Sequence, residues 1–93
     1  MKHIDWDDLK NDKLLLERGL AFEDVQTAFE ENHILAELKH HNRIRYPNQR
    51  LFVVEIDQYV YLIPYVEDED KIFLKTIIPS RKATKQYLKG GKQ

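Results

Sequence analysis

Two long apolar runs, separated by only two residues, constrain this chain more than any other feature. Residues 51–56 (LFVVEI) and 59–66 (YVYLIPYV) are rich in valine, isoleucine, tyrosine and phenylalanine, and Asp57-Gln58 lies between them. Such residues fit a pleated strand, and a two-residue connection joins antiparallel neighbours, so the runs predict a β-hairpin. Both runs are apolar at nearly every position rather than at alternate ones. Both faces of the predicted sheet are therefore expected to be at least partly covered, by helices or by a partner.

The part of the chain before this hairpin predicts two helices. Asp7 or Asp8 can cap a first helix by accepting hydrogen bonds from its free backbone N–H groups, and Gly19 suits the left-handed residue that ends it. A second helix is expected over about residues 22–32, because apolar side chains at positions 22, 25, 28 and 29 form one stripe. Its first turn carries two acidic residues, which the helix dipole favours.

The segment after the hairpin predicts a third strand and a short helix. Residues 72–78 are mostly apolar, and Pro79 would end the strand. Ser80 can cap a helix over residues 80–89, before a flexible tail at residues 90–93.

Three other segments complete the expected fold. Residues 34–38 fit either a strand or a continuation of the second helix, and residues 67–70 (EDED) fit a tight acidic turn. Pro64 cannot donate a ladder hydrogen bond, so the end of its strand is expected at a sheet edge or a bulge. The order of elements predicts one α+β domain over residues 1–89. It would contain two N-terminal helices, an antiparallel sheet of three to four strands with helices on one face, and a short C-terminal helix.

Charge is distributed unevenly along the chain. The net charge is −1, but residues 71–93 carry seven of the 15 basic side chains and none of the 16 acidic ones. Such a cationic end attracts phosphates or an acidic partner. The sequence has no apolar run near the roughly 20 residues that span a bilayer, and no secretory signal at its start, so a cytoplasmic protein is expected. The absence of cysteine excludes disulfides and thiolate zinc sites.

A cluster of basic residues precedes the hairpin. It comprises Lys39, His40, His41, Arg43, Arg45 and Arg50. Cleavage of RNA needs a base for the 2′-hydroxyl proton, an acid for the leaving oxygen and a cation for the phosphate. Histidine suits the first two roles and arginine the third. The alternative is a solvated basic loop. A metal site is not expected, because the two adjacent histidines lack a third ligand at suitable spacing.

A second basic cluster lies near the C-terminus. It comprises Lys75, Ser80, Arg81, Lys82, Lys85 and Tyr87. If Ser80 opens a helix, Arg81 and Lys85 share one face, and the free N–H groups at the helix start favour an anion. The alternative for Lys75 is a place at the sheet edge, paired with a carboxylate such as Glu55.

Three tyrosines of the hairpin form a separate candidate surface. Tyr59, Tyr61 and Tyr65 lie on one face of their strand, because side chains alternate along it. Such a stripe fits nucleobase stacking or, alternatively, the core or a protein interface.

Four short motifs occur in order along the chain. They are Ile4-Asp5-Trp6-Asp7 followed by Lys10-Asn11, the segment 18–25 (RGLAFEDV), Arg50 before Leu51-Phe52-Val53, and the segment 77–85 (IIPSRKATK). Together they resemble the pattern of BrnT-family toxins over nearly the whole chain. The chain departs from that pattern where Arg18 and Pro64-Tyr65 replace histidines of the family and Thr76 replaces an arginine.

The resemblance implies a function and a set of partners. It implies the toxin half of a bacterial type II toxin–antitoxin pair, with a RelE-like fold and a ribonuclease activity that blocks translation. A cognate antitoxin would bind and neutralise the protein and help to repress their shared operon, and the assembly is expected to be a homodimer or a heterotetramer with the antitoxin. The expected substrate is RNA, including ribosome-bound mRNA, and no metal or cofactor is expected.

This interpretation assigns roles to the two basic clusters. Arg50 and Arg81 would hold the scissile phosphate, His40 or His41 would transfer protons, and Tyr87 is a reserve candidate. The residues expected to bind the RNA backbone are Lys75, Lys82, Lys85, Lys89, Arg43 and Arg45. The hypothesis requires Arg50 and Arg81 to converge in space. The alternative function is a non-catalytic module that binds an antitoxin-like protein or nucleic acid. Direct DNA binding through the basic C-terminus is a third possibility, which the net charge of −1 disfavours.

Overall fold

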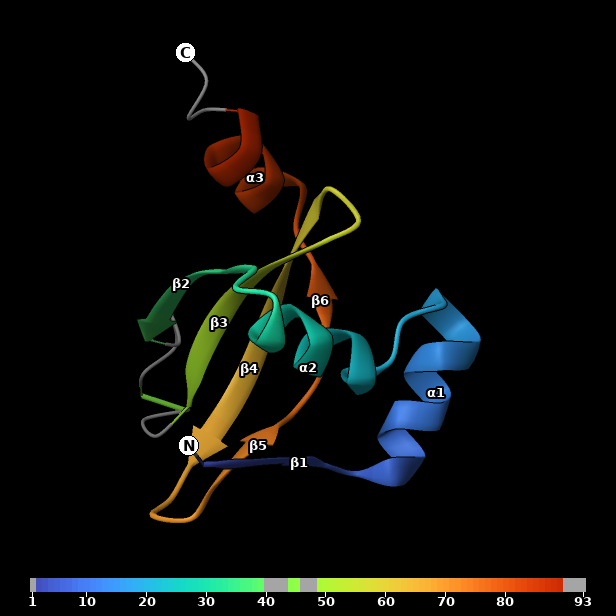
Figure 1. Ribbon diagram of the computed structural model, residues 1–93, viewed down its shortest axis with the longest axis vertical. Coiled ribbons are helices and arrows are strands. Elements are labelled where there is room, and N and C mark those ends of the chain that lie inside the picture. The colour runs from blue at the N-terminus through green and yellow to red at the C-terminus, as the bar shows by residue number, and fades with distance from the viewer. Residues whose placement is uncertain (1, 40–43, 46–48, 90–93) are drawn as a thin grey trace.

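The computed structural model describes residues 2–39, 44–45 and 49–89, which form a mixed β-sheet with helices packed on both of its faces (Figure 1). The strands follow the order β1 (His3–Trp6), β5 (Lys71–Leu74), β4 (Tyr59–Glu67), β3 (Arg50–Ile56) and β2 (Ile34–Lys39) across the sheet, and β6 (Ile78–Pro79) also pairs with β4. The helices are α1 (Asp8–Arg18), α2 (Phe22–Glu30) and α3 (Arg81–Thr84), and a π-helical turn, η1 (Lys85–Lys89), continues α3. The α+β class is therefore confirmed. The division into one domain and a tail stays a prediction, and residues 90–93 lie outside the described residues.

The predicted hairpin is confirmed as the pair β3 and β4. Their register runs from Ile56 opposite Tyr59 to Arg50 opposite Tyr65. Asp57 and Gln58 form the two-residue connection, and both have positive φ, 52° and 66°. Two successive left-handed residues give the turn whose twist matches that of paired antiparallel strands.

Both faces of this hairpin are buried, as its continuous apolar runs require. A larger core lies between α1, α2 and one sheet face, and includes Leu14, Phe22, Val25, Ala28, Phe52, Val54, Ile63, Tyr65, Leu74 and Ile77. A smaller core lies on the other face, where Ala83, Tyr87 and Leu88 pack on Val53, Val60, Leu62 and Ala36. The prediction of helices on one face is wrong, because the C-terminal helix covers the second face.

The sheet also has more strands than predicted, and it is not purely antiparallel. β1 pairs in parallel with β5, so that Ile4 lies opposite Ile72 and Trp6 opposite Leu74. Residues 34–39, left open between strand and helix, form β2 along the other edge, antiparallel to β3. The prediction of three to four antiparallel strands is therefore wrong in number and in direction. β1 has only four residues, and its partner lies more than 60 residues further along the chain, so no local pattern indicates the pairing.

The first helix begins and ends where its capping residues predict, and the second covers residues 22–30 of the predicted 22–32. The Asp7 carboxylate accepts the Lys10 N–H at 3.0 Å, and Gly19, with φ 70°, ends α1. Asn11 joins the helices, because its side-chain oxygen accepts the Phe22 N–H at 2.6 Å and its amide donates to Glu23 at 2.8 Å. This contact satisfies a free donor at the start of α2 and links α2 to α1.

Pro64 lies within the central strand β4, and the prediction of an edge or bulge is wrong. It pairs with Leu51 of β3, while its carbonyl accepts the Lys75 N–H at 2.8 Å on the opposite side of the strand. A residue's N–H and C=O point to the same side of a strand, so the missing donor of Pro64 faces away from β3. On that side of the strand, Pro64 lies between the residues of β4 that pair with β5 and those that pair with β6.

The predicted third strand, residues 72–78, is divided in two. β5 ends at Leu74, and β6 consists of Ile78 and Pro79, so Pro79 ends the second of these strands as predicted while also pairing with Tyr61. The acidic turn before β5 is confirmed: the Asp68 carboxylate accepts the N–H groups of Asp70 and Lys71, each at 2.9 Å. No helix within the described ranges is long and apolar enough to cross a membrane.

The C-terminal helix starts at its predicted cap and is tied to the sheet. The Ser80 hydroxyl accepts the Ala83 N–H at 3.0 Å, and the Thr84 hydroxyl donates to the Ser80 carbonyl at 2.7 Å. The Thr84 oxygen in turn accepts the Val60 N–H at 2.9 Å. Two positions of the BrnT-like motif, Ala83 and Thr84, therefore hold α3 on β4.

Candidate functional site

A tyrosine, a carboxylate and an arginine form a connected series at one end of the sheet. The buried Tyr65 hydroxyl donates a hydrogen bond to Glu37. The same Glu37 oxygen lies 3.6 Å from a guanidinium nitrogen of Arg50. About half of each charged side chain is exposed, 41% for Glu37 and 47% for Arg50. The series thus runs from the core to a position that a solvent-borne ligand can reach.

Strand register brings these three side chains together. Arg50 lies opposite Tyr65, and Glu37 lies opposite Phe52, which puts all three on the sheet face that α2 covers. Tyr65 is held by Phe52, whose ring is stacked on it with centroids 3.9 Å apart, and Phe29 of α2 meets Phe52 edge-on at 4.8 Å. Burial and the stack on Phe52 fix the tyrosine ring, so the direction in which its hydroxyl points is set by the core.

Glu37 is the member of this series that sequence patterns did not indicate. The local signal was weak: one acidic residue in a short segment that fitted either a strand or a helix. Its position beside Arg50 and Tyr65 depends on the pairing of β2 with β3 and of β3 with β4, which no local pattern sets.

The C-terminal cations lie in two places, since Arg81, Lys82 and Lys85 belong to α3 and η1 whereas Lys75 follows the last residue of β5. Lys75, Arg81, Lys82 and Lys85 are all exposed. The predicted partner of Lys75, Glu55, is not observed. Instead, its ammonium nitrogen lies 5.4 Å from the centre of the Phe73 ring. Lys89 closes η1. Tyr87, the reserve catalytic candidate, is half-buried and packs in the smaller core.

The structure does not bring Arg50 and Arg81 together. Arg50 lies on the face covered by α2, beside Tyr65, whereas Arg81 opens a helix that packs on the opposite face. The anchor of that helix on β4 is Val60, five residues from Tyr65 and thus about 16 Å along the strand. The expectation that both arginines hold one phosphate is therefore wrong for a single chain.

Four predicted site residues of the first basic cluster remain. His40, His41 and Arg43 lie outside the described residues, so their roles stay predictions. Arg45 lies in a turn and is exposed.

The tyrosine stripe does share one face, but Tyr65 is fully buried and stacks on Phe52. Tyr59 and Tyr61 meet edge-on at 5.5 Å, and burial, with Asp57 and Tyr59 nearby, raises the pKa of Tyr61.

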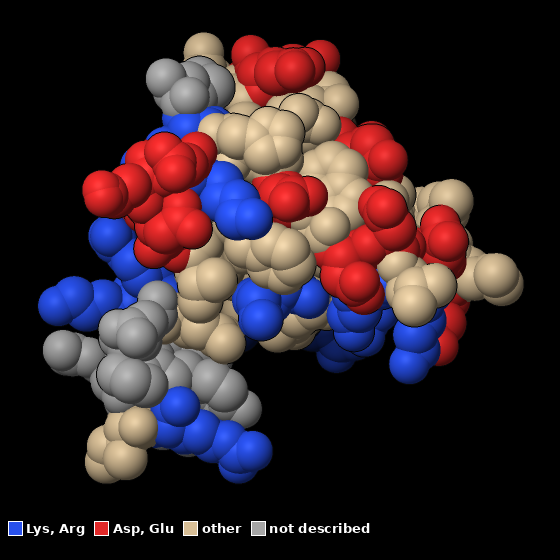
Figure 2. Space-filling view, turned by 90° about the horizontal axis from the view of Figure 1, so that it is seen from below, with Lys and Arg blue, Asp and Glu red and all other residues tan. Residues whose placement is uncertain are grey.

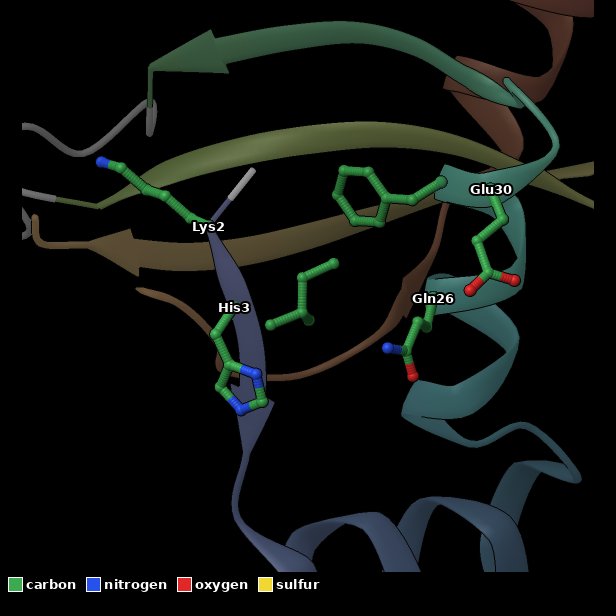
Figure 3. A pocket seen from close by; sticks show the side chains of 6 residues that line it. Lys2, His3, Gln26 and Glu30 are labelled. Atoms are coloured by element: carbon green, nitrogen blue, oxygen red, sulfur yellow. The ribbon is translucent and has the colours of Figure 1, made fainter. Parts of the chain in front are cut away.

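Acidic and basic side chains occupy different parts of the surface. At the end of the molecule that is lowest in Figure 1, acidic side chains cover much of the upper half of the view and basic ones gather along its lower half (Figure 2). The surface is thus divided into parts that repel and parts that attract phosphate. One hollow lies between β1 and α2 (Figure 3).

The described residues thus form a small mixed α+β domain with a half-exposed Arg50–Glu37 pair held by the buried Tyr65 and a separate set of exposed lysines and arginines. The chain belongs to the BrnT family: residues 6–86 match the family described as the ribonuclease toxin, BrnT, of a type II toxin–antitoxin system. No curated protein and no solved structure showed a significant match.

Proposed function

We propose that this protein is the toxin of a type II toxin–antitoxin pair, that it cleaves RNA without a metal ion in the cytoplasm, and that this cleavage inhibits translation. Family membership supports the toxin role. The observation that carries the chemistry is the contact of Glu37 with both Arg50 and Tyr65 at an accessible end of the sheet.

The proposed reaction uses the groups of this series directly. The Arg50 guanidinium holds the scissile phosphate and stabilises the charge that develops on its oxygens. The Glu37 carboxylate takes the proton of the adjacent 2′-hydroxyl, whose oxygen attacks phosphorus to form a 2′,3′-cyclic phosphate. The bond to the 5′-oxygen breaks, and that oxygen takes a proton from water or from His40 or His41. Tyr65 is a positioning residue, because it orients Glu37 from the core.

The cations around α3 have a separate role in this proposal. Arg81, Lys82 and Lys85 would bind the RNA backbone away from the scissile bond, with Lys89, and the other cations proposed to bind that backbone are Lys75, Arg43 and Arg45. Each phosphate neutralised by such a cation releases a counterion, so binding through these residues weakens as salt rises.

Expression in a bacterial host tests the proposal. Wild type, Arg50→Ala, Glu37→Gln and the control Lys13→Ala, which removes an exposed cation from α1, would be induced to equal soluble levels while growth and labelled methionine incorporation are followed. We expect arrest by wild type and by Lys13→Ala, and relief by the two site variants. The purified wild type should cleave RNA in the presence of EDTA, and the product should carry a 2′,3′-cyclic phosphate.

A second candidate function is a non-catalytic module that binds the antitoxin or nucleic acid. The Arg50–Glu37 ion pair favours it, since Glu37 already neutralises the cation that a phosphate would contact. A well-folded wild type that neither arrests growth nor cleaves RNA would refute the first function, and binding of the antitoxin or of nucleic acid by that protein would establish the second.

A further inference from the structure

The hollow between β1 and α2 has an apolar floor and a polar rim. Its volume is about 200 Å³, and it is lined by Lys2, His3, Ile4, Gln26, Phe29 and Glu30 (Figure 3). Ile4 and Phe29 pack against the larger core and form the floor. Gln26 and Glu30 lie one helical turn apart on the α2 side, and His3, the first residue of β1, and Lys2, which precedes it, lie on the other side. Ligand sites for drug-sized molecules span about 300–1,000 Å³, so this hollow suits a single side chain or ring.

Polar groups on this rim are available for a ligand. Within residues 2–39, 44–45 and 49–89, the side chains of His3, Gln26 and Glu30 have neither a hydrogen-bond nor an ion-pair partner. Lys2, in contrast, is occupied: its ammonium group lies 2.6 Å from the Glu67 carboxylate and 2.7 Å from the Asp68 carbonyl. The rim therefore presents one carboxylate, one carboxamide and one imidazole beside an aromatic ring, with its lysine already neutralised.

The charge of α2 indicates which ligand this hollow attracts. Residues 22–31 carry Glu23, Asp24, Glu30 and Glu31 and no basic residue, and all four of these side chains are exposed. Such a surface repels the phosphates of RNA and attracts a cation. The exposed cations of α3, by contrast, suit RNA.

We propose that this hollow receives an arginine side chain of the cognate antitoxin. The proposal rests on the proposed function, because the antitoxin is the partner that a type II toxin requires. The apolar stem would lie against Ile4, and the guanidinium would contact the face of Phe29. Its N–H groups would donate to the Glu30 carboxylate and the Gln26 carbonyl. Arginine fits better than lysine, because its planar fork donates to a carboxylate in two parallel bonds and stacks on an aromatic ring.

The first test measures the hollow alone and needs neither activity nor the antitoxin. N-acetyl-arginine amide, its neutral citrulline analogue and guanosine 5′-monophosphate would each be titrated into the ¹⁵N-labelled full-length protein. We expect the arginine probe to shift the amide signals of Ile4, Gln26, Phe29 and Glu30, and citrulline to bind about tenfold more weakly or not at all. Glu30→Gln should abolish the shifts, and Glu31→Gln, which removes an equal charge from outside the hollow, should keep them.

Three results of this titration would overturn the proposal. Equal weakening by Glu30→Gln and Glu31→Gln would show attraction by the helix charge alone. Shifts caused by the guanosine nucleotide and not by arginine would identify a nucleobase site. No shift of the hollow residues with any probe, up to the concentration at which the arginine probe saturates an acidic control surface, would exclude a site for this group.

A second test separates this proposal from the toxin function. Wild type, Glu30→Gln and Glu31→Gln would be expressed alone and together with the antitoxin that rescues growth of cells expressing wild type. We expect all three to arrest growth equally when alone, and the antitoxin to rescue Glu30→Gln at least several-fold less well than the other two. Equal rescue of all three would overturn the role of the hollow in antitoxin binding. Lack of arrest by wild type would instead refute the toxin function, and the titration result would stand independently.

Discussion

The buried hydroxyl of Thr84 accepts the backbone N–H of Val60 at 2.9 Å and joins the C-terminal helix to the central strand, beside the bond of 3.0 Å from the Ser80 N–H to the Val60 carbonyl. Val60 is fully buried, so its N–H cannot donate to water if the hydroxyl is lost. Thr84→Val keeps the shape of the side chain and removes the acceptor, and we expect a loss of about 1–3 kcal/mol in the free energy of unfolding. Thr84→Ser, which keeps the hydroxyl, should cost less. Chemical denaturation measures both, and an unchanged Thr84→Val midpoint would contradict the prediction.

Asn11 should contribute to stability through the start of α2. Its carbonyl accepts the Phe22 N–H at 2.6 Å, in place of a side-chain cap from Ala21. Asn11→Ala leaves that donor without a partner, and we expect a cost of about 1 kcal/mol in unfolding free energy. Asn11→Asp keeps the oxygen that accepts the Phe22 N–H. It loses the bond to Glu23 and adds a charge that repels the Glu23 carboxylate. If Asn11→Ala unfolds at the same denaturant concentration as wild type, the contact has no structural role.

The hairpin turn offers a stabilising substitution. Gln58 holds φ at 66°, a region that costs an ordinary residue roughly 1 kcal/mol, and Asp-Gly is a favoured pair in a turn with two left-handed residues. Gln58→Gly should therefore raise the melting temperature by a few degrees. The control is Gln86→Gly in η1, where the backbone is helical and glycine is expected to lower it. A lower melting temperature for Gln58→Gly would mean that the side chain itself stabilises the turn.

Tyr65→Phe separates the positioning role of the hydroxyl from the packing of the ring. The stack on Phe52 remains, and Glu37 loses a charge-assisted donor, so we expect about 1–2 kcal/mol less stability. RNA cleavage by the purified protein should fall by more than this loss of stability explains, because Glu37 would no longer be held beside Arg50. Tyr59→Phe, a half-buried tyrosine with no side-chain hydrogen bond among the described residues, is the control. Equal activity of Tyr65→Phe and wild type would remove Tyr65 from the mechanism.

Local patterns predicted the parts of this fold that local interactions determine. The hairpin, the caps at Asp7, Gly19 and Ser80 and the acidic turn depend on residues within a few positions of one another, and all are found in the structure. The strand β1 and the division of residues 72–78 depend on partners far along the chain. Pro79 illustrates the limit: it does end a strand, but that strand is β6, a two-residue segment whose pairing with Tyr61 and Leu62 of β4 no local pattern indicates.

The candidate site was harder to predict for the same reason. Arg50 and Arg81 each lie among basic residues in the sequence, but their separation in space depends on which sheet face each of them occupies. A shift of one residue in strand register reverses that face, and composition carries no information about it. Glu37 became a candidate only when β2 was placed beside β3.

Asp68 should make stability depend on pH in the acidic range. Hydrogen bonds from the Asp70 and Lys71 N–H groups hold the pKa of Asp68 below its ordinary value, with smaller contributions from the charges of Lys71 and Lys2. A carboxyl group with a lowered pKa in the folded state contributes stability that is complete above its unfolded pKa and is lost as pH falls through its folded pKa. Wild type should therefore be more stable than Asp68→Asn near neutral pH, and the difference should shrink as pH falls below the unfolded pKa of 3.8.

The measurement is the difference between the denaturation midpoints of the two proteins, taken side by side from about pH 7 to about pH 2, because the titration of the other carboxylates cancels in that difference. Glu69→Gln, a neutral change in the same turn at a side chain that accepts no hydrogen bond within the described ranges, should show a smaller dependence. A constant difference between wild type and Asp68→Asn across this range would show that the Asp68 charge is no more stabilised in the folded turn than in the unfolded chain.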